Sequence, residues 1–316
     1  MKQFDADTIE FLEALDPSTR KSYASGISAF QTFYRAQGTI KDFLDRVEED
    51  ASKPRRERGR IARNTLKAFM EWLQDNERNY KPKTVRAYVA AVQSEAKYFD
   101  IAISTQYVNL TAGKPFSQKY PWTLEEVARF VQKLKHPTYE TMAVVIFQSG
   151  LSLSDLLALT CEDIQHEFES GVTPLCLDLS RIKTDVPFMA FIGEWGVSLL
   201  KQHLAGRTLN PQSPLFVKAE RSIEDYFARL ARNMLGEYKG RNPMRPHSLR
   251  SAFQTMLSDH QVNQLYIDFW MGHKVPEQKG VYISKSREGW RETYKTQAEP
   301  WLTPREAGIV NACEDR

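Results

Sequence analysis

Between Arg245 and Tyr282 the chain reads RPHSLRSAFQTMLSDHQVNQLYIDFWMGHKVPEQKGVY. His247 and Arg250 are three positions apart, so on a helix both side chains point from one face. His273 lies further along, and Tyr282 follows it by nine residues. Guanidinium and imidazole groups are donors that suit phosphate oxygens, and a phenolic oxygen is able to form a covalent intermediate. The stretch therefore predicts a phosphate-handling site that requires neither a metal ion nor a cofactor.

The order and spacing of these residues resemble a known family. His247-Ser248-Leu249-Arg250, then Met271-Gly272-His273, then Tyr282 resembles the C-terminal motif of the tyrosine recombinase (phage integrase) family, which reads H-x-L-R, then L-G-H, then a tyrosine about nine residues on. Three elements in the same order make the resemblance specific. It implies a mainly α fold, with a helical N-terminal core-binding (SAM-like) domain and a mixed α/β catalytic domain that carries a small antiparallel β-sheet.

The resemblance also implies a reaction. Tyr282 would attack a phosphate of double-stranded DNA and form a 3′-phosphotyrosyl link, while His247, Arg250 and His273 hold the phosphate. Strand exchange of this kind gives site-specific integration, excision or resolution for a mobile element. Because the family acts on paired sites, the resemblance implies a homotetramer on DNA.

A hairpin is predicted over residues 174–192, PLCLDLSRIKTDVPFMAFI. Apolar residues alternate on both sides of a polar turn, which is the pattern of two antiparallel strands. In the family a lysine on this turn protonates the departing 5′ oxygen, and Lys183 matches that position. A solvated turn lysine is the alternative interpretation.

Residues 149–164, SGLSLSDLLALTCEDI, resemble the start of the helix that carries the family's first catalytic arginine. Gly150 and Asp155 match the pattern, but the arginine position holds Ser152. Serine is short and uncharged, and loss of one preorganised donor typically lowers an enzyme's rate about a hundred- to a thousandfold. Ser152 also suits the N-cap of a helix that begins at Leu153, with Asp155 as its partner. We therefore expect weak or absent activity from this chain.

Length and composition agree with an ordinary two-domain globular protein. The chain has 316 residues, of which 41% are hydrophobic and 26% charged, and its net charge is +3. Any binding to nucleic acid must therefore come from local basic clusters. The three cysteines are too few for a disulfide framework or a zinc site. No apolar run is as long as a membrane span, and the acidic N-terminus is unlike a signal peptide, so we expect a cytoplasmic, nucleoid-associated protein without membrane contact.

Three segments are expected along the chain. Residues 1–110 carry helical stripes of apolar side chains and predict a helical DNA-clamp domain. Residues 111–121, TAGKPFSQKYP, lack periodicity and predict a linker. Residues 122–316 predict the catalytic domain, which opens with a capping box at Thr123 and Glu126.

Basic residues gather at several points that a DNA backbone could reach. The densest run is KPRRERGRIAR at 53–63, which is either a solvated loop or a phosphate contact. The basic stretch before His247 and the lysine after His273 are further candidates. The predicted DNA-binding residues are Arg55, Arg56, Arg58, Arg60, Arg63, Arg181, Lys239, Arg241, Arg245 and Lys274.

Two other tyrosines compete with Tyr282 for the nucleophile's role. Tyr266 and Tyr294 lie in helical patterns where packing is the simpler explanation, and Tyr282 has the family's spacing. Lys285 and Arg287 follow Tyr282 and favour an anionic substrate nearby. The chain beyond them carries large apolar residues, which would dock either on a neighbouring protomer or on the parent domain.

Two other functions fit the same residues. A catalytically silent DNA-binding protein would keep the clamp and lose the chemistry, which Ser152 favours. A strand-nicking enzyme of the type IB topoisomerase kind would share the chemistry and differ in needing no specific, paired site.

Overall fold

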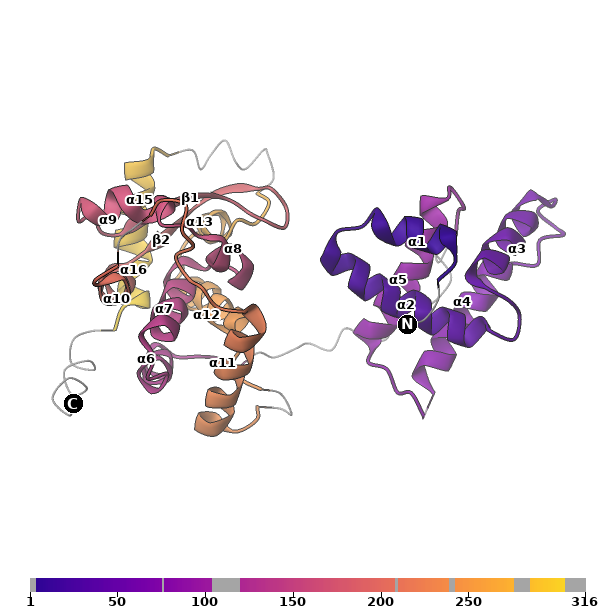
Figure 1. The fold of residues 1–316 in the computed structure, drawn as a ribbon, viewed down its shortest axis with the longest axis horizontal. Coiled ribbons are helices and arrows are strands. Elements are labelled where there is room, and N and C mark those ends of the chain that lie inside the picture. Colours follow the sequence, from indigo (N-terminus) through magenta and orange to yellow (C-terminus); the bar gives the residue numbers. More distant parts are fainter. Residues whose placement is uncertain are drawn as a thin grey trace. The chain divides into compact units, whose positions relative to one another are not determined.

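The computed structural model describes residues 4–75, 77–103, 120–207, 210–238, 242–275 and 285–304. The chain forms two compact units, Met1–Ser117 and Gln118–Arg316, whose elements are labelled in Figure 1. The division between them falls within the segment expected as a linker, of which residues 111–119 lie outside the described part. Within the described ranges, no helix has both the length and the apolar character needed to cross a bilayer.

The first unit is a bundle of helices around an aromatic core. Phe30 is fully buried, and its ring centroid lies 5.0 Å from that of Phe43 and 5.1 Å from that of Phe69. Gly26 lets two helices pack closely, because a Cβ there would lie 2.9 Å from Cα of Tyr88. The helices are α1 (Ala6–Glu13), α2 (Pro17–Tyr34), α3 (Ile40–Ser52), α4 (Ile61–Gln74) and α5 (Pro82–Tyr98).

The second unit is built around one apolar helix, α7 (Pro137–Ser149). Every residue from Thr141 to Ser149 is buried, which is expected of a helix that is apolar on all sides. Four helices, α6, α10, α12 and α16, and strand β2 pack against it. Figure 1 shows α7 at the centre of this unit. The surrounding helices are α6 (Leu124–Lys133), α8 (Leu153–Ala158), α9 (Glu162–Glu169), α10 (Glu194–Leu204), α11 (Glu220–Leu235), α12 (Pro246–Asp259), α13 (Gln264–Trp270), α15 (Arg287–Gln297) and α16 (Glu299–Leu302).

The predicted hairpin is present, with β1 (Leu175–Ser180) paired antiparallel to β2 (Pro187–Ile192). Its register sets Leu175 opposite Ile192, at the end of the hairpin far from the turn. Both faces are covered at that end, because Phe191, which points to the opposite face from Ile192, is buried and stacks on Tyr294 with centroids 5.2 Å apart. The fold class expected from the sequence, mainly α with a small antiparallel sheet, is confirmed.

The C-terminal helices α15 and α16 pack on their own unit. The ring of Trp290 stacks on Phe269 with centroids 4.7 Å apart, and Leu302 is fully buried. Trp301 stacks on His260 at the end of α12, with ring centroids 3.5 Å apart and planes 8° from parallel. Of the two docking alternatives for this segment, the structure shows the parent domain for residues 287–302.

Candidate active site

Arg250 is the most firmly held cation among the candidate residues. It lies on α12, one turn after His247 as predicted, and only 3% of it is exposed. Its Nη1 donates to the carbonyl oxygen of Gly150, and its Nη2 donates to that of Met271 at 2.7 Å. Burial, and next the charge of Arg181, lower the pKa of Arg250 to about 10. A guanidinium fixed in this way is preorganised for an anion.

Gly150 receives Arg250 because it ends α7 in the left-handed region, at φ +68°. A Cβ at this position would lie 2.8 Å from a ring carbon of Phe253, so both backbone conformation and space favour glycine. The sequence pattern that identified Gly150 thus corresponds to a helix end whose carbonyl faces the site.

His273 is held between a carboxylate and the buried guanidinium. Its Nδ1 lies 3.1 Å from Oδ1 of Asp268, and its Nε2 lies 3.1 Å from Nη2 of Arg250. The backbone N–H of His273 also donates to the carbonyl of Asp268 at 2.8 Å. Because Arg250 only donates, the tautomer that satisfies both ring contacts carries its proton on Nδ1 and leaves the Nε2 lone pair toward Arg250.

A second guanidinium lies in the same place. Nη1 of Arg181 donates to the carbonyl of Met271 at 2.8 Å, the same oxygen that Arg250 contacts. Arg181 opens the hairpin turn, where its N–H donates to Val186 and its carbonyl accepts from Asp185 at 2.7 Å. The turn therefore fixes the backbone of Arg181, whose side chain contacts Met271, a residue 90 positions later in the sequence.

Ser152 caps α8 as the sequence predicts. Its hydroxyl oxygen accepts from the N–H of Asp155 at 3.3 Å and donates to Oδ2 of that carboxylate at 2.6 Å. The other oxygen of Asp155 accepts from the N–H of Ile182 in the hairpin turn at 3.2 Å. Asp155 therefore connects the start of α8 to the turn that carries Arg181.

Of the remaining predicted catalytic residues, the structure describes Lys183 and His247. Lys183 is exposed at the tip of the turn, two residues after Arg181, and His247 is exposed on α12. Tyr282 lies outside the described residues, as do all of positions 276–284. The structure thus brings Arg250 and His273 together and places Lys183 on the turn that carries Arg181.

Tyr294 is a packing residue of the core in this structure. It is fully buried, and its hydroxyl donates to the carbonyl of Gln148 at 2.8 Å. Burial raises the pKa of this phenol well above its usual value. Tyr266 has a packing role too, because its ring lies edge-on to Trp290 with centroids 5.2 Å apart.

Lys285 and Arg287, which the sequence suggested as neighbours of an anionic substrate, both have protein partners. Lys285 lies over the ring of Tyr266, with Nζ 4.6 Å from the centroid, and donates to Thr293 at 2.6 Å. Arg287 donates to the carboxylate of Glu167 at 3.0 Å. Both cations are engaged in holding α15 on its own unit.

The part of the basic segment that precedes α4, residues 53–60, is a braced loop, and Arg63 lies in the first turn of α4. The carboxylate of Asp50 accepts from the N–H groups of Gly59 at 2.5 Å and Ile61 at 3.2 Å. Burial alone would raise the pKa of Asp50, but the N–H groups of Gly59, Ile61 and Arg60 outweigh it and lower that pKa. The loop is therefore tied to α3, and its arginine side chains are displayed from a fixed backbone.

The predicted DNA contacts differ in exposure. Arg63 and Arg181 are half-buried, and Lys239 and Arg241 lie outside the described residues. Arg58 bends back so that its Nε donates to the carbonyl of Lys53 at 3.0 Å. The exposed members are Arg55, Arg56, Arg58, Arg60, Arg245 and Lys274.

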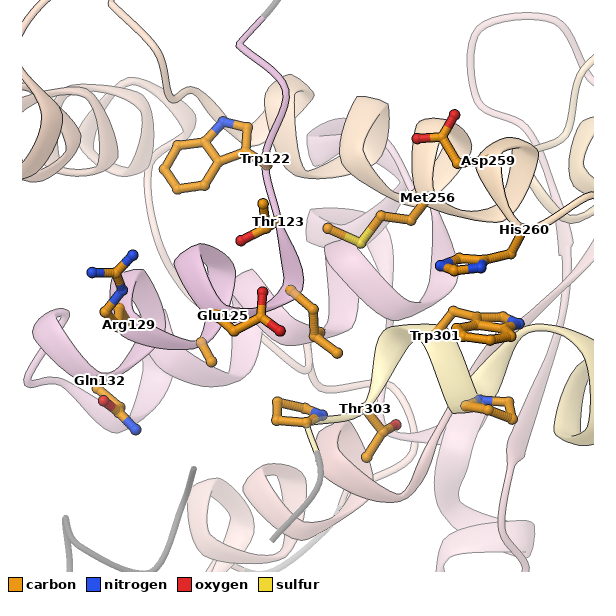
Figure 2. Close-up of a pocket in the computed structure, with 14 residues that line it drawn as sticks. Trp122, Thr123, Glu125, Arg129, Gln132, Met256, Asp259, His260, Trp301 and Thr303 are labelled. Atoms are coloured by element: carbon orange, nitrogen blue, oxygen red, sulfur yellow. The ribbon is translucent and has the colours of Figure 1, made fainter. Parts of the chain in front are cut away.

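A cavity of about 750 Å³ lies elsewhere on the second unit. Figure 2 shows its walls, which include Trp122 and Glu125 at the start of α6 and the stacked pair His260 and Trp301. None of the described candidate catalytic residues lines it. The candidate site is instead a surface formed where α7, α12 and the hairpin turn meet.

Three residues of the site were not given these roles from the sequence: Asp155 as the brace of the hairpin, Asp268 as the partner of His273, and Arg181 as the neighbour of Arg250. Asp268 had a local signal, because it precedes His273 by five residues. The other two contacts join segments that are far apart in sequence, so no spacing could reveal them.

Comparisons with known proteins identify a family and a shared fold. The profile described as "Phage integrase family" matches residues 122–288. The fold is similar to that of a lambda integrase fragment, residues 75–356, in a dimer bound to a COC′ core site, with 16% identity, TM-score 0.57 and coverage of 90% of this chain and 94% of that one. No curated protein sequence matches the chain.

Two further solved structures share the fold. XerH site-specific recombinase, in a post-cleavage complex with palindromic difH substrate, has 16% identity and TM-score 0.56, with coverage of 88% of this chain and 79% of that one. The Tn1549 transposon integrase, in complex with a circular intermediate DNA, has 15% identity and TM-score 0.55, with coverage of 85% and 98%.

Proposed function

The chain belongs to the phage integrase family, and we propose that it is a tyrosine-type site-specific DNA recombinase that exchanges strands through a 3′-phosphotyrosyl intermediate. The observation that supports this proposal most directly is the cluster of Arg250, Arg181 and His273, in which both arginines donate to the carbonyl of Met271 and Arg250 also contacts His273. In sequence, His273 precedes Tyr282 by nine residues. Donors of this kind stabilise the charge of a phosphoryl transition state without a metal ion.

The proposed reaction is a transesterification. The oxygen of Tyr282 attacks the scissile phosphorus, and the bond between phosphorus and O5′ breaks with its electron pair on O5′. When Arg250 turns to the bound phosphate, the Nε2 lone pair of His273 is released and takes the phenolic proton, while the Nδ1 proton still faces Asp268. Lys183 delivers a proton to O5′. Arg250 and His247 hold the non-bridging oxygens. The bond energy remains in the phosphotyrosyl ester, and attack by a 5′ hydroxyl of a partner strand reverses the step.

The two units would have separate roles on DNA. The helical N-terminal domain, expected over residues 1–110, would act as a clamp through the basic segment at 53–63, and the domain at 122–316 would carry the chemistry. Replacing Arg55, Arg56 and Arg60 by alanine is expected to weaken binding to duplex DNA of any sequence. The slope of log K against log salt concentration should become shallower by about 0.9 for each phosphate that the variant no longer neutralises. Lys67→Ala, on the exposed face of α4, is the matched control.

The proposal includes an assembly and a location. A homotetramer on two paired sites is the proposed working unit, and the proposed location is the cytoplasm, in association with the nucleoid and without membrane contact. The similar lambda integrase structure contains a dimer on a core site.

A second candidate function is favoured by one observation. Position 152 carries a serine, which has no positive charge. Its hydroxyl donates to the carboxylate of Asp155. A catalytically silent DNA-binding protein of the same fold is therefore the alternative.

Covalent capture tests both functions and does not require a known target site. The chain is incubated with a pool of nicked duplexes of random sequence, and DNA bound covalently to protein is recovered and sequenced. A recombinase should enrich a defined site with paired half-sites, and Tyr282→Phe should abolish capture. Capture without sequence preference would indicate a relaxing enzyme of the type IB kind. Tight DNA binding with no capture, even by Ser152→Arg, would support the silent protein and overturn the recombinase.

A further inference from the structure

The hairpin turn places a second guanidinium beside that of Arg250. Arg181 and Arg250 donate to the same carbonyl, that of Met271, at 2.8 Å and 2.7 Å. Since each donor nitrogen is under 3 Å from that oxygen, the two nitrogens are less than about 6 Å apart. Like charges held this close repel each other, and an anion bound between them removes the repulsion.

Neighbouring residues hold Arg181 in this position from two sides. Asp155 accepts from the N–H of Ile182, the next residue in the turn, at 3.2 Å. On the other side, a Cβ at Gly272 would lie 3.3 Å from Cδ of Arg181 and 3.0 Å from the ring of Phe188. Gly272, at φ +65°, thus leaves the space that the stem of Arg181 occupies.

The acid that braces the turn is also the partner of the residue that lacks the charge. Ser152 donates to one oxygen of Asp155 and the turn donates to the other, so the start of α8 and the backbone beside Arg181 are linked through one side chain. Arg181 is half-buried, whereas Arg250 is almost fully buried, so Arg181 is the guanidinium more accessible to a substrate.

We propose that Arg181 is a catalytic residue that contacts the scissile phosphate and supplies the positive charge that Ser152 does not. This inference rests on the proposed recombinase function and deepens it. Arg181 and Arg250 form a two-guanidinium clamp on the non-bridging oxygens, in which one arginine comes from the hairpin turn and the other from α12. A planar fork on each side suits two oxygens of a phosphodiester.

The first test compares the rate of covalent adduct formation on a nicked duplex of the captured sequence. Arg181→Ala is expected to lower that rate about a hundredfold or more, and Arg181→Lys to fall between this variant and the parent because it keeps the charge and loses the fork. The double variant Ser152→Arg with Arg181→Ala is expected to recover part of the lost rate. Arg221→Ala, whose side chain is 92% exposed on α11, is the control and keeps the parent rate. Unchanged adduct formation by Arg181→Ala would overturn the proposal.

The second test does not depend on cleavage. Inorganic phosphate is titrated into the full chain carrying Tyr282→Phe, and the side-chain Nε–H resonances of arginine are followed by NMR. Phosphate should shift the resonances of Arg181 and Arg250 together, and Arg181→Ala should weaken binding about tenfold with an unchanged melting temperature. If no variant cleaves DNA but phosphate still binds both arginines, the recombinase fails and the two-guanidinium anion site stands. If phosphate binds equally well without Arg181, the anion site itself is wrong.

Discussion

The hydroxyl of Ser152 donates a 2.6 Å hydrogen bond to the carboxylate of Asp155. The other oxygen of the same carboxylate accepts from the backbone N–H of Ile182. Asp155 therefore joins the start of a helix to a hairpin turn. Compared with an arginine, a serine at position 152 lacks the positive charge. It is instead part of a connection between α8 and the hairpin turn, in which Asp155 and Ile182 are 27 residues apart in sequence.

Asp155→Ala is expected to release the hairpin turn. Asp155 is 5% exposed, and its loss leaves the hydroxyl of Ser152 and the N–H of Ile182 without this partner, which should cost about 1–3 kcal/mol of stability. Amide hydrogen exchange at Ile182 should accelerate. Asp163→Ala, which removes an exposed cap from the N–H of Thr160, is the control and should leave exchange at Ile182 unchanged. Protection at Ile182 that survives Asp155→Ala would contradict the bracing role.

The two tyrosine substitutions should separate chemistry from packing. Tyr294→Phe removes the hydroxyl that donates to Gln148, which should lower stability by about 1–2 kcal/mol and leave covalent DNA capture intact. Tyr282→Phe should abolish capture. Urea unfolding and covalent capture, measured on both variants, check this pair. A loss of capture in Tyr294→Phe at full DNA binding would contradict the assignment of the nucleophile.

Glu167 should control how firmly α15 is attached. Arg291 donates to it at 2.6 Å and Arg287 at 3.0 Å, and Glu167 is 8% exposed. Arg291→Ala leaves the buried carboxylate of Glu167 without its shortest ion pair and should lower the free energy of unfolding by about 3 kcal/mol. Glu288→Ala removes the exposed partner of the same arginine and should cost under about 1 kcal/mol. Equal losses in urea unfolding would show that burial of the pair does not matter.

The same carboxylate predicts a loss of stability in acid. Burial alone would raise the pKa of Glu167, but Arg291, the N–H of Cys176 and Arg287 outweigh it and lower that pKa. A carboxyl whose folded pKa is below its unfolded pKa stabilises the fold above the unfolded value. That contribution should disappear as the pH falls through the folded pKa, and Glu167→Gln should unfold with a flatter acid limb.

Glu95 should make the first unit less stable as the pH rises. It is 1% exposed, and burial raises its pKa to about 7, with Asp5 and Asp7 adding to the rise and the hydroxyl of Thr8 opposing it. The folded unit then binds more protons than the unfolded chain between the ordinary value of 4.5 and about 7, so stability falls with pH across that window. The loss above it amounts to about 3 kcal/mol.

Glu95→Gln should remove this pH dependence and be the more stable protein at pH 8. Amide hydrogen exchange of the buried residues of α5 follows the unfolding of the first unit at each pH. Glu10→Gln, an exposed carboxyl on α1 that accepts from the hydroxyl of Tyr98, is the control. A parent protein whose stability stays flat from pH 5 to pH 8 would rule out a buried ionisable Glu95.

The sequence alone determined what depends on local spacing. Apolar stripes predicted that residues 1–110 are helical, alternation predicted the hairpin, and the Ser152 and Asp155 pair predicted the cap of α8. Helix and strand geometry fixes which near neighbours share a face, so these features need only a few consecutive residues. The same short-range order identified the family through the motif around Arg250.

Only the tertiary structure decided which charges meet. Arg181 and Arg250 share one carbonyl because the hairpin turn and α12 both pack beside the end of α7. Arg287 donates to Glu167, 120 positions away, and the hydroxyl of Tyr294 donates to the carbonyl of Gln148, 146 positions away, and spacing alone indicated neither contact. Such partners are set by how the core helices pack, and no local pattern records the packing of segments that are distant in the chain.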